Sequence, residues 1–196
     1  MDSKMKEWFS LFDKPNKKLK IYYTPEAYMK TRALVRTWPV EIGWNMVIKP
    51  YKDGYLVSNI LVYPQKTSPA YIEVDPGKYG MWKAELSDEE DSNLFGHGHS
   101  HVNMDVFASG TDLRQQFEET MLKNKGFYLF QIWNKKNRVN STFYDLDNKI
   151  LYLNPDIDLL IDFQDMSYEE FIRKSFCNVS KMEGDPKITD EFEQIV

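Results

Sequence analysis

Apolar residues in the N-terminal half form short runs separated by turn residues, which predicts strands interleaved with helices. Thr24 and Pro25 carry the signature of a helix start, because threonine caps helices well and proline fits the first helical position. Lys52, Asp53 and Gly54 predict a tight turn between two strands. We expect helices at 5–12, 25–36 and 77–86, and strands at 20–23, 41–48, 55–63 and 71–74.

In the second half, a strand at 94–99 precedes a stretch with helical spacing at 112–123. Strands at 126–133, 141–146 and 149–153 follow, joined as an antiparallel set by tight turns at 135–137 and 147–148. The acidic run 87–91 predicts a solvated loop, and a capping-box pattern predicts a helix at 167–176. One face of the 112–123 helix is expected to carry Leu113, Phe117, Thr120 and Met121.

The order of these elements shows hairpins but no regular alternation of strand and helix. This order favours a mixed α+β fold, an α/β/α sandwich, over a doubly wound parallel sheet. A chain of 196 residues is long enough for one well-buried core. We therefore expect an N-terminal extension over 1–18, one main domain over 19–165, and a C-terminal helix with a loose tail over 166–196.

Composition narrows the class of protein. The formal charge of −5 is mild and gives no basic footprint for nucleic acid. No apolar stretch approaches the length of a membrane span, and the N-terminus lacks the apolar core of a secretion signal. Cys177 is the only cysteine, which excludes disulfide frameworks and four-cysteine zinc sites. We expect a cytoplasmic protein that acts on neither nucleic acid nor membrane.

All three histidines lie within five residues, as His97, His99 and His101. His99 and His101 are two apart at the end of a predicted strand, so both side chains can reach one metal ion. Asp112 follows at the start of a predicted helix and can supply a third ligand. Two imidazoles and a carboxylate suit zinc with an open fourth position, which is typical of a catalytic site. Ser109, on the turn before Asp112, is placed to donate to a developing oxyanion.

This pattern resembles the JAMM motif of the JAMM/MPN (JAB) family of zinc metalloproteases. The match comprises His99-Ser100-His101, seven residues, Ser109, two residues and Asp112, and the order of elements agrees over 24–153. The Phe107-Ala108-Ser109 approach resembles the ubiquitin-specific members, and prokaryotic or phage-type members are similar as well. One departure is Val102, which stands where the family usually has proline after the second histidine.

The resemblance implies roles as well as a fold. It implies an MPN/JAB-like sandwich around a mostly antiparallel, curved sheet of the cytidine-deaminase-like kind. It assigns Glu41, after a helix and before a strand, as general base, with His99, His101 and Asp112 as zinc ligands and Ser109 as oxyanion donor. The implied activity is hydrolysis of a peptide or isopeptide bond in a protein or peptide substrate, including a ubiquitin-like C-terminus.

Several residue assignments and the function itself still have alternatives. Glu73 and Glu85 are fallback carboxylates for the base, and His97 is expected to be a surface residue or a residue behind the metal ligands. Asp105 is expected to be a solvated loop residue rather than a ligand. A non-catalytic MPN-fold scaffold in a larger assembly is the alternative function. A zinc nucleobase deaminase is excluded, because that chemistry requires a Pro-Cys-x-x-Cys segment.

Overall fold

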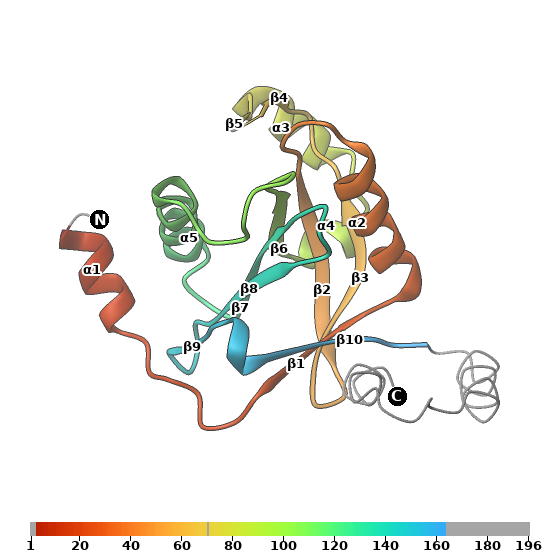
Figure 1. Ribbon diagram of the computed structural model, residues 1–196. Helices are drawn as coiled ribbons and strands as arrows, with labels where there is room; N and C mark the ends of the chain where they lie inside the picture. The colour runs from red at the N-terminus through yellow and green to blue at the C-terminus, as the bar shows by residue number, and fades with distance from the viewer. Residues whose placement is uncertain (1–2, 70, 164–196) are drawn as a thin grey trace, which may run out of the picture.

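The computed structural model describes residues 3–69 and 71–163 (Figure 1). Its helices are α1 (Ser3–Ser10), α2 (Pro25–Thr37), α3 (Pro76–Ala84), α4 (Asp88–Ser92) and α5 (Gly110–Lys123), with a 3₁₀ turn at Asn154–Asp156. Its strands are β1 (Leu19–Tyr23), β2 (Gly43–Tyr51), β3 (Gly54–Leu61), β4 (Lys66–Ser68), β5 (Tyr71–Glu73), β6 (Leu94–Ser100), β7 (Phe127–Trp133), β8 (Val139–Asp145), β9 (Ile150–Tyr152) and β10 (Ile157–Ile161).

Eight of the described strands form one mixed sheet in the order β10-β1-β3-β2-β6-β7-β8-β9. Four neighbouring pairs are antiparallel, namely β3–β2, β2–β6, β7–β8 and β8–β9. The pairs β10–β1, β1–β3 and β6–β7 are parallel. The expected mixed α+β class with a mostly antiparallel sheet is confirmed.

Helices cover both faces of this sheet, so the domain has three layers (Figure 1). On one face α2 contributes Ala27 and Val35 to a core cluster shared with β1, β2, β3, β6 and β7. On the other face α1 and α5 lie against β7 and β8, where Phe9 and Phe12 of the α1 region contact Tyr144. Trp8 links the two helices, since its Nε1 donates to Thr120 Oγ1 at 3.2 Å. The sandwich architecture is therefore present.

The alternation of glycine and histidine along β6 has a packing cause. Gly96 and Gly98 face the core side: a Cβ at Gly98 would lie 2.4 Å from Trp44 Nε1, and one at Gly96 would lie 2.7 Å from Ile48 Cδ1. Only glycine fits under these large side chains, because a real Cβ cannot approach that closely. Successive strand residues point to opposite faces, so the histidines point to the α5 side.

Most predicted elements appear close to the expected bounds. Thr24 caps α2 by accepting from the Ala27 N–H, and Pro25 occupies the first turn as expected. The turn at Lys52 joins β2 to β3, with Lys52 at a φ of 49°. Strands β7, β8 and β9 form the expected antiparallel set.

Some predictions were wrong. Residues 87–91 are not a loop: α4 forms there because Ser87 and Glu90 make a reciprocal capping box. The expected face of α5 is correct for Thr120, which is buried, but wrong for Met121, which is 47% exposed, and the buried Gln116 was not expected there. Strands β4 and β10 were not predicted at all. The helix expected at 167–176 and Cys177 lie outside the described residues.

None of the helices in the described part of the chain combines the length and the apolar character needed to cross a lipid bilayer.

Candidate metal centre

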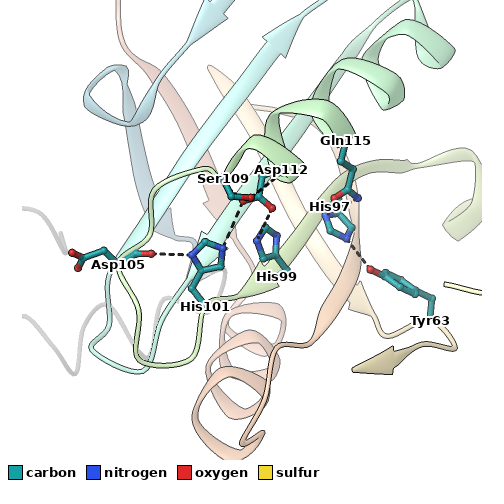
Figure 2. A network of polar contacts seen from close by, with 8 residues as sticks. All are labelled: Tyr63, His97, His99, His101, Asp105, Ser109, Asp112 and Gln115. Carbon is teal, nitrogen blue, oxygen red and sulfur yellow. Dashed lines mark hydrogen bonds and ion pairs between the residues drawn. The ribbon is translucent and has the colours of Figure 1, made fainter. Parts of the chain in front are cut away.

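The end of β6 and the start of α5 bring three of the predicted site residues together (Figure 2). His99 lies in β6, and His101 follows the last residue of that strand, where its N–H donates to the Trp133 carbonyl at 2.8 Å. Asp112 lies in the first turn of α5. The nearest metal-binding atoms of the three side chains all lie within 4.8 Å of one another. The strand end and the helix start thus converge on one point.

The distances within this group fit a zinc ion. His99 Nε2 lies 3.2 Å from Asp112 Oδ1, and His101 Nε2 lies 3.7 Å from Asp112 Oδ2. Ligand atoms of a tetrahedral zinc site, with bonds near 2.0–2.1 Å, are separated by roughly 3.3 Å. His99 and His101 are also buried, at 8% and 7% exposure, which keeps competing water away from most of the imidazole surface.

The tautomer of His101 is set by the backbone. Its Nδ1 lies 2.9 Å from the Asp105 carbonyl oxygen (Figure 2), and a carbonyl only accepts, so Nδ1 carries the hydrogen. Nε2 then keeps its lone pair for a metal ion, which is the arrangement seen around metal-bound histidines. The Asp105 side chain points to solvent with 64% exposure and pairs with Arg138, as expected for a loop residue that is not a ligand.

Asp112 is held as a carboxylate. Burial alone would raise the pKa of Asp112, but the adjacent His99 and the hydrogen bonds from Ser109 hold it well below its usual value. Ser109 is the N-cap of α5: its N–H donates to Asp112 Oδ2 at 2.6 Å, and its Oγ accepts from the Asp112 N–H at 3.2 Å. The same reciprocal contact therefore begins the helix and orients the Asp112 carboxylate.

A cavity of about 520 Å³ opens onto this group. Glu41, which lies two residues before β2, lines it together with the three ligand residues and Ser109. Burial raises the pKa of the Glu41 carboxyl above its ordinary value, although the neighbouring His99 and His101 oppose that shift. The fallback carboxylates Glu73 and Glu85 are exposed and do not line this cavity.

The walls of the cavity include residues that the sequence did not single out. Arg114 and Glu118 of α5 line it, and both are exposed. Large apolar side chains that line it are substantially exposed, namely Tyr71, Val74, Met104 and Phe107, of which the sequence motif includes only Phe107. The sequence gives little sign that these residues share one cavity, because β5 and the 102–109 loop come together only in the folded chain.

His97 is not a surface residue. It is 6% exposed, and burial lowers its pKa to about 3, so the imidazole is neutral near pH 7. Its Nε2 lies 2.8 Å from the Tyr63 hydroxyl, and its Nδ1 lies 3.5 Å from Gln115 Nε2 (Figure 2). His97 thus lies beside His99 and lines the same cavity.

Val102 gives the loop after His101 its own path. Its φ is 49°, in the left-handed region that β-branched residues rarely adopt. Proline is fixed near −65° and cannot take this conformation. The departure from the JAMM pattern at this position therefore coincides with a backbone turn that the usual proline would not allow.

No protein-family model matches the chain, and no curated protein matches it. Among solved structures, the chain is similar to the solution structure of protein DSY2949 from Desulfitobacterium hafniense, with 16% identity and a TM-score of 0.49. That likeness covers 72% of this chain and 94% of the other.

Proposed function

We propose that this protein is a zinc-dependent metallo(iso)peptidase of the JAMM type. The observation that carries the proposal is the convergence of His99, His101 and Asp112 at one end of a cavity that Glu41 also lines. Two neutral nitrogen ligands and one anionic oxygen ligand leave a coordination position open, as in catalytic zinc sites. The resemblance of the motif to the JAMM pattern supports the same assignment.

His99 Nε2, His101 Nε2 and a carboxylate oxygen of Asp112 would hold the ion. Zinc in such a site supplies Lewis acidity, which lowers the pKa of water towards neutrality and polarises a carbonyl group. The buried Glu41 carboxylate would accept a proton from the attacking water and return it to the nitrogen of the leaving amine. Its raised pKa suits this exchange, because a base works best when its pKa approaches the operating pH.

Ser109 would stabilise the oxyanion that forms from the scissile carbonyl. Its Oγ accepts from the Asp112 N–H, so the hydroxyl hydrogen can donate into the cavity that Ser109 lines. A donor aimed at developing charge is worth roughly 3–4 kcal/mol in related acyl-transfer sites. The role of Ser109 as helix cap is compatible with this donation.

The substrate would be a protein or peptide, with a ubiquitin-like C-terminus as one form, and the place of action the cytoplasm. Apolar side chains at both sides of the cavity rim suit an extended peptide segment. The net charge of −5 favours neither a nucleic-acid partner nor an anionic membrane surface.

The decisive experiment measures zinc content and cleavage in parallel. Wild type, Glu41→Gln and Glu118→Gln are purified, their zinc stoichiometry is determined, and each is incubated with a panel of ubiquitin-like fusions and peptides. We expect one zinc per chain in all three, and at least a 100-fold loss of cleavage only in Glu41→Gln. Glu118→Gln is the matched control, because Glu118 lines the same cavity.

Two results would overturn the proposal. Wild-type protein without stoichiometric zinc would leave a non-catalytic scaffold as the better account. Unchanged cleavage in Glu41→Gln would remove Glu41 from its role as base.

A further inference from the structure

Three side chains in a row, two of them buried, lie beside the proposed metal ligands and line the same cavity, but have no role in the proposed chemistry. Tyr63, which follows β3, contacts His97 of β6, and His97 contacts Gln115 of α5 (Figure 2). Tyr63 and His97 are 5% and 6% exposed. The Tyr63 and His97 rings also stack, with 6.0 Å between their centroids. This row crosses from the sheet to the helix that carries Asp112.

The contacts of this row lie beside the contact between His99 and Asp112. His97 and His99 are two apart on β6 and share a face, and their ring centroids lie 5.9 Å apart. Asp112 and Gln115 are three apart on α5 and therefore occupy neighbouring turns of one helix face. Strand β6 and helix α5 are thus joined by two neighbouring side-chain pairs, His99 with Asp112 and His97 with Gln115. The second pair forms without a metal ion.

The outer end of the row is fixed by close packing. A Cβ at Gly43 would lie 2.1 Å from the Tyr63 hydroxyl, so the hydroxyl reaches His97 only because residue 43 is glycine. The Gln65 side chain brackets Gly43: its Oε1 accepts from the Gly43 N–H and its Nε2 donates to the Gly43 carbonyl, both at 2.8 Å. Tyr79 and Trp82 of α3 pack edge-on against the Tyr63 ring.

We propose that His97 is a positioning residue for the metal site. Tyr63 holds the His97 ring in place, so that α5 keeps its distance from β6 and the Asp112 carboxylate faces His99 before an ion binds. The inference rests on the proposed function in one respect, namely that His99, His101 and Asp112 bind zinc. Contacts that orient metal ligands typically account for a 10- to 100-fold difference in metal affinity. His97 acts through the spacing of β6 and α5 rather than as a metal ligand.

The test compares Tyr63→Phe with Tyr79→Phe. Tyr63→Phe keeps the ring and removes only the hydroxyl that contacts His97. Tyr79→Phe removes a hydroxyl from the same aromatic cluster, one that accepts from Asn45 Nδ2 at 2.8 Å, whereas the Tyr63 hydroxyl contacts His97. Zinc affinity is measured by competition with a chromophoric chelator, and the ligand geometry by the visible absorption bands of the cobalt(II)-substituted protein.

We expect Tyr63→Phe to weaken zinc binding about tenfold and to shift the cobalt bands, and Tyr79→Phe to leave both unchanged. His97→Asn, as a second variant, removes both contacts of the imidazole and should show a larger loss. Wild-type affinity and spectrum in Tyr63→Phe would overturn the inference, and so would equal losses in both tyrosine variants. A wild-type protein that binds neither metal would instead overturn the proposed function itself.

Discussion

His99 Nε2 lies 3.2 Å from Asp112 Oδ1, although the two residues belong to a strand and a helix that follow one another through an irregular loop. The contact is possible because the end of β6 and the start of α5 lie next to each other (Figure 2). The Ser109 cap turns the first helical residues so that the Asp112 carboxylate faces the histidines. The cap that begins the helix therefore also brings the Asp112 carboxylate to the two histidines.

Asp112→Asn should abolish most of the stabilisation by zinc. An asparagine oxygen can still accept from the Ser109 N–H, so the metal-free fold should persist, but the anionic ligand is lost. Zinc at 100 times the wild-type Kd should stabilise wild type by about 2.7 kcal/mol, and a 100-fold weaker variant by about 0.4 kcal/mol. Thermal unfolding with and without zinc measures the difference. Asp105→Asn, with an exposed side chain, is the control and should respond as wild type does.

Val102→Pro should destabilise the protein even though proline is the more usual residue in the JAMM pattern that the motif resembles. A φ of 49° is inaccessible to proline, and the Val102 carbonyl is fixed by a 2.7 Å hydrogen bond from the Lys135 N–H. We expect a loss of more than about 1 kcal/mol in urea unfolding. Val102→Gly, which accepts positive φ, should stay within about 1 kcal/mol of wild type. A Val102→Pro variant as stable as wild type would refute the described loop path.

Asp53 should contribute stability that depends on pH. Hydrogen bonds from Lys20 and Tyr22 lower the pKa of Asp53 to about 2, below its unfolded value near 3.9. Because the folded pKa is depressed, the contribution is complete above pH 4 and is lost as the pH falls through about 2. Asp53→Asn keeps an acceptor for Tyr22 and removes the charge. Its melting temperature should be lower than that of wild type at pH 6 and should approach the wild-type value near pH 2.

Gly98→Ala should destabilise the core face of β6. The added methyl group would lie 2.4 Å from Trp44 Nε1, and Trp44 is fully buried, so neither side can move freely. Overpacking of this kind costs about 1–3 kcal/mol. Gly80→Ala is the matched control, since nothing lies within 4 Å of the added atom and alanine favours the α3 helix. Chemical denaturation of both variants should therefore give shifts of opposite sign or clearly different size.

Sequence patterns predicted secondary structure correctly where the local backbone geometry strongly favours one residue type at one position. Thr24 with Pro25 predicted the start of α2, and Lys52 to Gly54 predicted the β2–β3 turn. The acidic run at 87–91 misled because charge suggested solvent, while Ser87 and Glu90 also form a capping box that begins a helix. Strand β10 was missed, because its parallel pairing with β1 joins the two ends of the described chain.

The sequence by itself was enough to select four of the candidate site residues. His99, His101, Ser109 and Asp112 could be selected because strand alternation, helix capping and metal-ligand chemistry each act over a few residues. Only the tertiary structure decided that Glu41 lines the same cavity, that Glu73 and Glu85 do not, and that His97 is buried between Tyr63 and Gln115. Those relationships depend on which strands pair and which helix covers them. Such long-range packing depends on how all the core side chains fit together, and a local pattern of residues does not contain that information.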